Sequence, residues 1–330
     1  MSWSVNTAKE CSEGTAMSNL HKKIFVRDST LREGLDTPTV NFSLEQKLII
    51  SRLLDRAGIP EIEIAAPGNF LEDLVFAEAL AREGLDIKKS GLIYAGNPSC
   101  PEQIEKASLL LDRVDILMPL SPARKPYDYE TKIRLLLEAL EYGLAQKAHV
   151  GVGFPHATQV ESAVLLEIGG MAVTKGADRV TVYDTNGSSD PFFVHDLLKK
   201  IKKDLSVPVF FHGHNDLGLA GANSLAAVFA GADGLDLTVN GLGDRAGNAS
   251  LEQLAMALYL RGFETGISLK DLVQLSKAVA KESGIPQSKL APVAGEFVFS
   301  HKSPGHMEHP ELFEAFDPGL IGRDRALIQR

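Results

Sequence analysis

Hydrophobic residues follow two different periods along the chain. Short apolar runs rich in β-branched residues alternate with longer segments in which apolar residues recur every three or four positions. The runs predict buried strands and the longer segments predict amphipathic helices, because side chains alternate faces in a strand and return to one face at each helical turn. Eight strand-like runs follow one another, at residues 24–30, 61–68, 90–96, 114–121, 149–156, 179–185, 208–214 and 235–241.

Helical patterns fill the intervals between these runs, and several open with a Ser, Thr or Asn cap and close on Gly. Eight strand and helix repeats over about 240 residues predict an α/β protein with a (β/α)8 TIM barrel. A doubly wound open sheet is the alternative, but no G-x-G-x-x-G motif follows the first strand. The clearest helical segments are 43–58, 71–85, 131–147 and 250–262.

The pattern divides the chain into three parts. Residues 1–21 are polar and lack periodicity, so we expect a flexible leader before a barrel at residues 22–266. Residues 267–330 form a C-terminal extension, with a helical pattern followed by an irregular tail rich in Pro, Gly and His. The tail contains aromatic residues that favour burial, so we expect it to fold over a barrel face of its own or of a partner subunit.

Composition excludes several classes of function. The chain has 330 residues, 44% of them hydrophobic, which is enough for a globular core, and its net charge of −9 with one dense basic run at 199–205 disfavours nucleic-acid binding. No apolar run approaches the roughly 18 residues of a membrane span, and no signal sequence is recognisable, so we expect a soluble cytoplasmic protein. Cys11 and Cys100 are interpreted as free thiols.

Chemistry-bearing residues cluster where the strands end, which is the catalytic face of a TIM barrel. His212 and His214 point to the same side of one strand, although such a pair alone is equally consistent with polar residues where a strand leaves the core. The first and seventh strands are near neighbours in a closed ring, so a carboxylate from Asp28 or Glu33 can reach both imidazoles. Such a set suits a catalytic Mn²⁺, Mg²⁺ or Zn²⁺ ion, with Asn248 able to add an amide oxygen.

Arg32 and Glu63 complete this candidate site. Arg32 adjoins the metal carboxylate, where it either pairs with Glu33 or a helix end, or stabilises the charge of a developing oxyanion. We favour the catalytic role. Glu63 stands at the end of the second strand and is expected to hold Arg32 in place.

Three motifs then coincide: DSTLREG at 28–34, HGHNDLGLA at 212–220 and NGLGDRAGNASLEQ at 240–253. Together they resemble the DRE-TIM metallolyase superfamily (HMGL-like), which contains isopropylmalate, homocitrate and citramalate synthases and also 3-hydroxy-3-methylglutaryl-CoA lyase. The loop GLGDRAGN is similar to the synthase form. The resemblance therefore implies a homodimeric, metal-dependent acyltransferase that performs a Claisen condensation of an acyl-CoA, expected to be acetyl-CoA, with a 2-oxo acid.

The same resemblance assigns roles to individual positions. Arg32 matches the catalytic arginine of the family, Glu33, His212 and His214 match its metal ligands, and Asn248 matches the asparagine near or on the metal. A lyase that runs the reverse aldol reaction is the alternative within the fold. A metal-binding protein without catalysis is the alternative outside it.

The tail resembles a synthase segment whose histidine and tyrosine, often contributed by the dimer partner, help to deprotonate acetyl-CoA. His301 and His306 match its histidines, whereas Phe313 stands at the tyrosine. Asp36 replaces a usual Gln, and Asp244 replaces the glutamate of the eighth-strand loop. Proton transfer in this chain is therefore expected to use His301, with His306 as the alternate. In place of the tyrosine it would use water or Asp244, or the acyl donor would be one whose carbon acid ionises more easily.

The remaining assignments concern the two substrates. We expect the loop after the eighth strand to bind acyl-CoA, and residues at other strand ends to bind the 2-oxo acid and set its side-chain selectivity. The acyl-CoA residues are Asn240, Gly241 and Gly243, and the 2-oxo acid residues are Tyr94, His156, Asp184 and Thr185.

Overall fold

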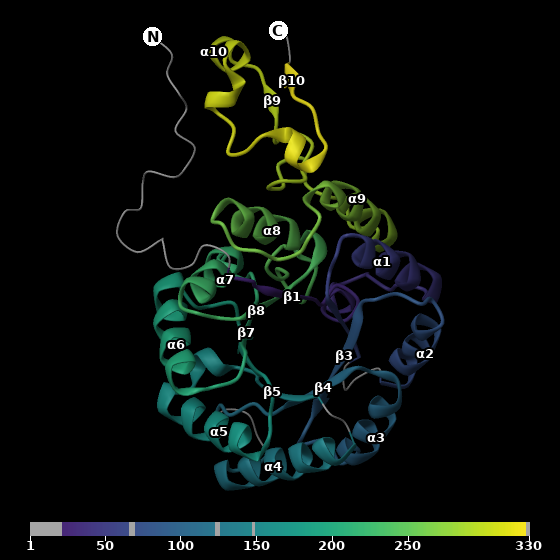
Figure 1. Ribbon diagram of the computed structural model, residues 1–330, viewed down its shortest axis with the longest axis vertical. Helices are drawn as coiled ribbons and strands as arrows, with labels where there is room; N and C mark the ends of the chain where they lie inside the picture. Colours follow the sequence, from purple (N-terminus) through teal and green to yellow (C-terminus); the bar gives the residue numbers. More distant parts are fainter. Residues whose placement is uncertain (1–21, 66–69, 123–125, 147–148, 328–330) are drawn as a thin grey trace.

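Eight parallel strands close into a barrel, and a helix follows each strand (Figure 1). The computed structural model describes residues 22–65, 70–122, 126–146 and 149–327, so the segment 1–21 expected as a leader lies outside the described residues. Pairing follows sequence order and the last strand closes on the first, which confirms the TIM barrel. The strands are β1 (Phe25–Asp28), β2 (Glu61–Ala65), β3 (Lys88–Tyr94), β4 (Arg113–Leu117), β5 (Val150–Phe154), β6 (Val180–Asp184), β7 (Val209–Gly213) and β8 (Gly234–Leu237).

The surrounding helices begin where side chains satisfy their free amides. Ser43 forms a capping box with Gln46, and the Asp190 carboxylate accepts hydrogen bonds from the amides of Phe192 and Phe193. None of the helices in the described residues is both long and apolar enough to cross a membrane. The helices are α1 (Leu44–Arg56), α2 (Phe70–Ala81), α3 (Cys100–Leu110), α4 (Tyr129–Gln146), α5 (Ser162–Lys175), α6 (Pro191–Asp204), α7 (Ala220–Phe229) and α8 (Leu251–Leu260).

The barrel has an apolar outer layer and a charged interior. Residues such as Ile62, Val114 and Val182 are buried between the strands and the helices. Side chains on the opposite face of the same strands fill the barrel, and these include the buried Arg27 and Asp115. The alternation that marked the strands in the sequence therefore separates hydrophobic packing from a polar core.

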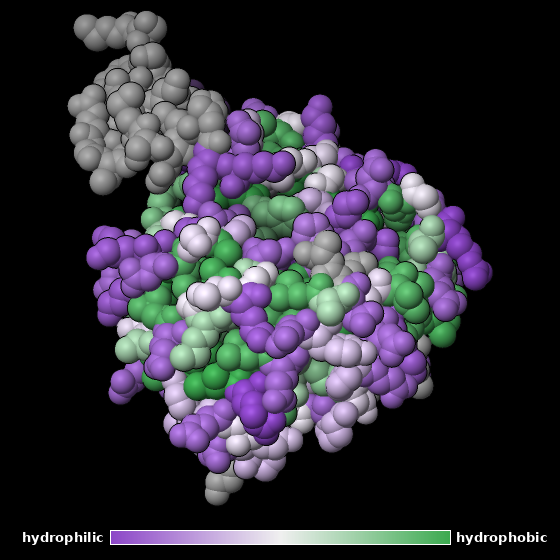
Figure 2. Space-filling model, turned by 60° about the horizontal axis from the view of Figure 1, so that its bottom comes forward, coloured by the Kyte–Doolittle hydropathy of each residue, from purple (hydrophilic) through white to green (hydrophobic). Residues whose placement is uncertain are grey.

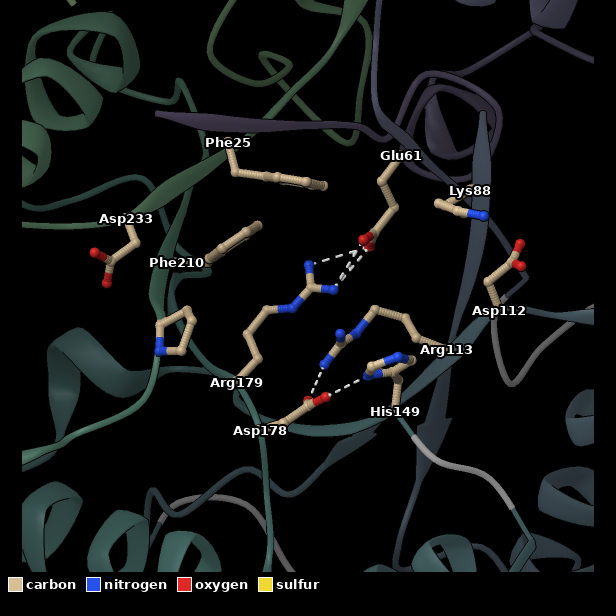
Figure 3. Close-up of a pocket in the computed structure, with 11 residues that line it drawn as sticks. Phe25, Glu61, Lys88, Asp112, Arg113, His149, Asp178, Arg179, Phe210 and Asp233 are labelled. Carbon is tan, nitrogen blue, oxygen red and sulfur yellow. Dashed lines mark hydrogen bonds and ion pairs between the residues drawn. The ribbon is translucent and has the colours of Figure 1, made fainter. Parts of the chain in front are cut away.

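A cavity of about 540 Å³ opens at the N-terminal ends of the strands, opposite the end expected to be catalytic (Figure 3). Most of the charged residues that line it are paired. Arg179 donates hydrogen bonds to Glu61 and lies 4.4 Å from the ring of Phe210, while Asp178 meets both Arg113 and His149. The N-terminal face of a TIM barrel contributes to stability, and these paired groups are consistent with that role.

The C-terminal extension begins with α9 (Leu272–Ser283) and continues through β9 (Ser300–His301), α10 (Pro304–Glu308) and β10 (Ala326–Leu327). β9 and β10 form a small parallel pair, and a separate apolar cluster joins Phe299 and Ile321 to Met256 of α8. Figure 1 shows β9, α10 and β10 projecting beyond α8 and α9, outside the ring of helices. The extension thus packs beside its own barrel.

Exposed apolar side chains belong to different parts of the surface. Leu109 of α3, Phe192 of α6 and Leu290 after α9 are among the most exposed large ones. In the view of Figure 2, hydrophilic and hydrophobic residues are interspersed over the visible face. Singly exposed apolar residues are normal on a protein surface.

The packing inside β8 gives a testable prediction. A methyl group at Gly234 would overlap the ring of Phe210, which is held between Arg179 at 4.4 Å and Phe25 at 5.6 Å. Gly234→Ala should therefore lower the free energy of unfolding by about 1–3 kcal/mol. Urea unfolding measures this value.

Gly170→Ala is the matched control. Gly170 lies within α5 and nothing stands within 4 Å of the added methyl group. This substitution should raise the free energy of unfolding by roughly 0.5–1 kcal/mol, because alanine favours a helix interior. Equal effects of the two substitutions would contradict the packing described for β8.

Candidate active site

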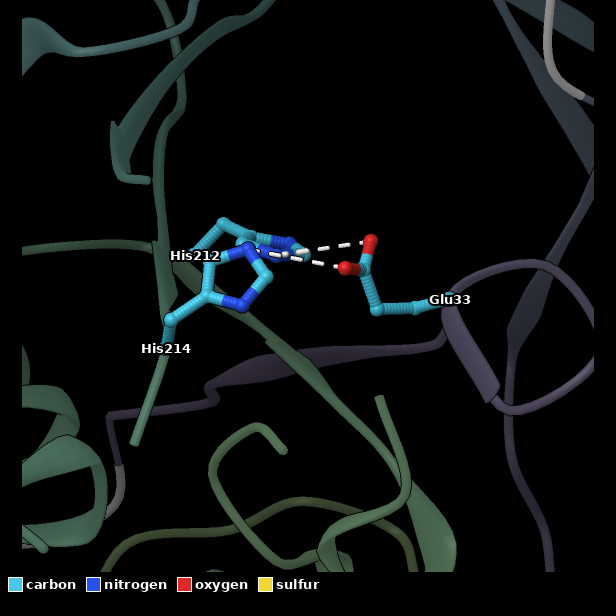
Figure 4. Close-up of side chains that lie close together, drawn as sticks. All are labelled: Glu33, His212 and His214. Atoms are coloured by element: carbon cyan, nitrogen blue, oxygen red, sulfur yellow. Dashed lines mark ion pairs between the residues drawn. The ribbon is translucent and has the colours of Figure 1, made fainter. Parts of the chain in front are cut away.

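Glu33, His212 and His214 come together at the C-terminal ends of β1 and β7 (Figure 4). Glu33 opens a short 3-10 turn, Glu33–Asp36, after β1, and the two histidines lie at the end of β7. The His212 Nε2 atom lies 3.8 Å from Oε2 of Glu33, and the His214 Nε2 atom lies 3.5 Å from Oε1. All three side chains are buried. Of the two carboxylates considered from the sequence, the structure brings Glu33 to the imidazoles.

These donors fit a divalent cation. One ligand atom from each residue lies within 4.8 Å of the others. Burial lowers the pKa of His214 to about 2, so its imidazole is neutral, as a metal ligand must be. The buried Oδ1 atom of Asn248 has no hydrogen-bond partner in the described part of the chain, and its Nδ2 atom lies 2.9 Å from Nε2 of His212. Glu33, His212, His214 and Asn248 would thus hold the ion.

Gly243 allows this close approach. A methyl group there would overlap Oδ1 of Asn248 and lie 3.3 Å from Cγ of Glu33. The Thr37 hydroxyl bonds both the amide and the carbonyl of Gly243, at 2.8 and 3.0 Å, and so fixes the loop after β8 against the loop after β1. Gly243, expected to bind acyl-CoA, is therefore also needed to place two candidate metal ligands.

Arg32 bridges two carboxylates beside this cluster. Its guanidinium contacts Glu33, and its Nε atom donates a 2.6 Å hydrogen bond to Oε2 of Glu63. The Ser29 hydroxyl donates to the same Glu63 oxygen at 3.1 Å. Arg32 thus pairs with Glu33 and is held by Glu63 at the same time. Glu63 in this way keeps the guanidinium of Arg32 next to the candidate metal site.

Hydrogen bonds connect the loop after β5 with the loop after β6. The buried Asp184 carboxylate accepts hydrogen bonds from the Thr158 hydroxyl and the Ser189 amide, so it stabilises the two loops. The Thr185 hydroxyl accepts a 2.8 Å hydrogen bond from the amide of His156. His156 is half-buried, as is Tyr94 at the end of β3.

The loop after β8 is anchored at both ends. The Asn240 amide group donates to the carbonyl of Ser276 and accepts from its hydroxyl, which ties this side chain to α9. Gly241 accepts a backbone hydrogen bond from Asn248. Asp244 is 47% exposed and pairs with Arg245. Asn240 therefore has a structural contact that the sequence did not indicate.

Arg245 connects three loops and was not singled out from the sequence. Its guanidinium forms two hydrogen bonds with Asp216 after β7, one with Asp244 after β8, and one with the carbonyl of Thr185 after β6. Asp216 and Thr185 lie 29 and 60 residues away in sequence, so no local pattern pointed to these contacts. Arg27 and Asp236, charged residues inside β1 and β8, were also missed.

The backbone is strained around this end of the barrel. Five non-glycine residues of the described chain have a positive φ angle. Four of them lie in loops that follow strands, and left-handed conformations in such residues gather at functional sites. These four are Thr39 (74°), His156 (59°), Asn240 (59°) and Arg245 (55°).

His301 and His306 lie in the C-terminal extension. The His301 Nε2 atom lies 3.0 Å from Oε1 of Glu314, whose carboxylate also pairs with Arg325. His306 stacks on Phe313, with ring centroids 3.7 Å apart. Within the described residues, neither histidine forms a hydrogen bond or ion pair with the strand ends of its own barrel.

Comparisons with known proteins agree with this geometry. The family model described as HMGL-like matches residues 23–279. Homocitrate synthase 1 of Nostoc sp. is 34% identical over 93% of this chain and 83% of its own length. A 2-isopropylmalate synthase of Methanocaldococcus jannaschii is also 34% identical, over 94% of this chain and 61% of its own. An HMG-CoA lyase structure from Bacillus subtilis matches the fold with a TM-score of 0.71 and 20% identity, over 83% of this chain and 97% of that one.

Asp28 gives a prediction about pH. Its carboxylate accepts two 2.9 Å hydrogen bonds from Thr30, yet burial raises its pKa from 3.8 to about 7. Between pH 4 and 7 the folded state therefore holds a proton that the unfolded state has lost. Because the pKa is raised on folding, the free energy of unfolding should fall as pH rises through this window, by up to about 1.4 kcal/mol per pH unit.

Asp28→Asn should remove this part of the pH dependence, since the amide does not titrate. Urea unfolding of both proteins across the window measures the slope. Glu83→Gln, at a surface ion pair with Arg52, is the control and should keep the slope of the parent protein between pH 5 and 7, since the hydrogen bond from Arg52 lowers the pKa of Glu83 from 4.5. A parent slope retained by Asp28→Asn would show that Asp28 is ionised throughout.

Proposed function

The chain belongs to the HMGL-like family, and on this basis we propose that it is a divalent-metal-dependent acyltransferase that condenses an acyl-CoA with a 2-oxo acid. The observation that carries the proposal is the cluster of Glu33, His212 and His214 with Arg32 at its side. The loop GLGDRAGN at 241–248 favours the synthase direction over the lyase direction. Acetyl-CoA is the simplest acyl donor.

The condensation joins the methyl carbon of the acyl group, after it loses a proton, to the ketone carbon of the 2-oxo acid. A bound divalent cation supplies Lewis acidity toward the ketone oxygen. Arg32 faces the negative charge that develops on this oxygen, and Glu63 keeps the guanidinium in position. The oxygen becomes a hydroxyl group, and water then hydrolyses the thioester, which releases free CoA and a 2-hydroxy-2-alkyl dicarboxylic acid.

His301 is the proposed acceptor of the methyl proton. Glu314 holds its Nε2 atom at 3.0 Å, which leaves the other ring nitrogen for proton transfer. His306 is the alternate, and its stacking on Phe313 gives that residue a packing role in place of a tyrosine hydroxyl. Asp244, half exposed in the loop after β8, is available to exchange protons with water.

Two copies of the chain are needed in this proposal. The extension that carries His301 projects outside its own ring of helices, so it would serve the site of a partner subunit in a homodimer (Figure 1). We assign acyl-CoA binding to the loop that contains Gly241 and Gly243. The side chain of Asn240 is bonded to α9 and would hold this loop in place. We assign the 2-oxo acid to Tyr94, His156 and Thr185, with Asp184 supporting their loops.

The reaction itself is tested by thiol release. The protein with Mn²⁺ and acetyl-CoA should release CoA only when a suitable 2-oxo acid from a panel is present. Arg32→Lys should reduce kcat by about 10²–10³-fold, because a lysine cannot reproduce the planar contact with Glu63. Arg52→Lys, at a surface ion pair, should keep the parent rate.

Other outcomes identify the alternatives. Release of acetyl-CoA from 3-hydroxy-3-methylglutaryl-CoA, without condensation of any 2-oxo acid, would establish a lyase. Binding of Mn²⁺ without turnover of either kind would establish a metal-binding protein and overturn the enzymatic proposal.

Exchange of the extension is tested by subunit complementation. His301→Ala and Arg32→Lys are each expected to have low activity, but they damage different halves of a composite site. Dimers that combine one copy of each contain one intact site, so co-expression should restore about a quarter of the parent activity. Activity no higher than that of the separate variants would show that the extension acts on its own barrel.

A further inference from the structure

Arg27 lies in the interior of the barrel, among carboxylates of other strands. It is fully buried, and it contacts carboxylates from three strands other than its own. Its Nε and Nη2 atoms form a fork with Asp236 of β8, at 2.8 and 2.7 Å. Its Nη1 atom lies 2.5 Å from Asp115 of β4 and 3.4 Å from Glu63 of β2. A guanidinium used in this bidentate way fixes the rotation of the carboxylate that it binds.

Asp236 connects this guanidinium to a candidate metal ligand. Its Oδ2 atom lies 3.1 Å from Nδ1 of His212. Strand register places the three residues in one row, since Arg27 pairs with Asp236 across β1 and β8, and Asp236 pairs with His212 across β8 and β7. All three are at most 1% exposed. Backbone pairing therefore sets the spacing of the row.

The row determines which nitrogen of His212 is free. A carboxylate held by an arginine fork accepts hydrogen bonds, so Nδ1 of His212 carries the proton and donates it to Asp236. The lone pair is then on Nε2, which faces Glu33 at 3.8 Å. The Nδ2 atom of Asn248, 2.9 Å from Nε2, is consistent with this tautomer because an amide nitrogen donates.

His214 lacks this support. Its Nδ1 atom is buried and has no hydrogen-bond partner in the described part of the chain. Of the two imidazoles, only that of His212 thus has a hydrogen-bond partner on Nδ1 in the described part of the chain. That partner is Asp236, so the orientation of the His212 ring depends on it. Partners behind a ligating histidine commonly change metal affinity by 10–100-fold.

The second branch from Arg27 reaches the catalytic arginine. The Nη1 atom of Arg27 lies 3.4 Å from Oε1 of Glu63, and the other oxygen of the same carboxylate accepts the 2.6 Å hydrogen bond from Arg32. One buried cation therefore contacts both the carboxylate behind His212 and the carboxylate behind Arg32.

We propose that Arg27 and Asp236 are positioning residues that orient the metal-facing nitrogen of His212, with Arg27 also steadying Glu63 behind Arg32. This inference rests on the proposed function of Glu33, His212 and His214 as metal ligands. It assigns a role in metal binding to two residues that touch neither the metal nor a substrate.

Asp236→Asn and Asp115→Asn form a matched pair for the test. Each replaces a carboxylate that contacts Arg27 with an amide of the same shape, but only Asp236 also contacts His212. Both variants should be less stable to urea, because a charge near Arg27 is lost. Calorimetric titration of the metal-free proteins with Mn²⁺ should show 10–100-fold weaker binding for Asp236→Asn and about the parent affinity for Asp115→Asn.

A second pair examines the arginine fork. Arg27→Lys keeps the charge and loses the fork, and Arg179→Lys does the same at Glu61, near the opposite end of the barrel. Arg27→Lys should weaken Mn²⁺ binding and lower kcat, while Arg179→Lys should change neither. Parent affinity in Asp236→Asn, or equal losses in the two members of either pair, would overturn the proposal.

Nitrogen NMR of the metal-free parent protein decides the matter even if the variants fail to fold. The spectrum should show His212 protonated on Nδ1, and a proton on Nε2 would overturn the proposal. The same experiments separate this inference from the function on which it rests. A parent protein that binds no Mn²⁺ contradicts the proposed metal site, whereas parent binding with unchanged affinity in Asp236→Asn contradicts only the role of Asp236.

Discussion

The ion pairs of Arg27 with the carboxylates around it constrain the rest of the barrel. A guanidinium without access to water is strongly unfavourable unless its charge and its donors are matched, and each neighbouring carboxylate has the same requirement. The partners come from β2, β4 and β8, so the match exists only when the strands keep the observed register. Shifting one strand by a residue would turn its carboxylate toward the helices. The charged interior therefore specifies one closure of the sheet.

This constraint explains how much of the fold could be predicted. All eight strands were found from the sequence because apolar outer residues and short length mark them clearly. The approach of Glu33 to His212 was also expected, because the strands that carry them are near neighbours in a closed ring. Both inferences need only the order of the elements.

Contacts that depend on register could not be predicted in the same way. Arg27 and Asp236 looked like polar residues within strands, and nothing local shows that they pair across β1 and β8. Arg245 was missed for the same reason, since its partners belong to three separate loops. The side-chain contact of Asn240 with Ser276 depends on how α9 docks, which is a tertiary feature.

The left-handed residues around the catalytic end have a consequence for protein engineering. Each holds its loop in a conformation that costs folding free energy, whereas ion pairs such as that of Arg179 with Glu61 stabilise the N-terminal end of the barrel. Replacing the exposed Thr39 with glycine would relieve local strain and raise thermal stability, but it would also loosen the loop after β1, which carries Glu33. At the C-terminal end of the barrel, substitutions that raise thermal stability therefore tend to lower the catalytic rate. At the N-terminal end, stabilising substitutions are less constrained.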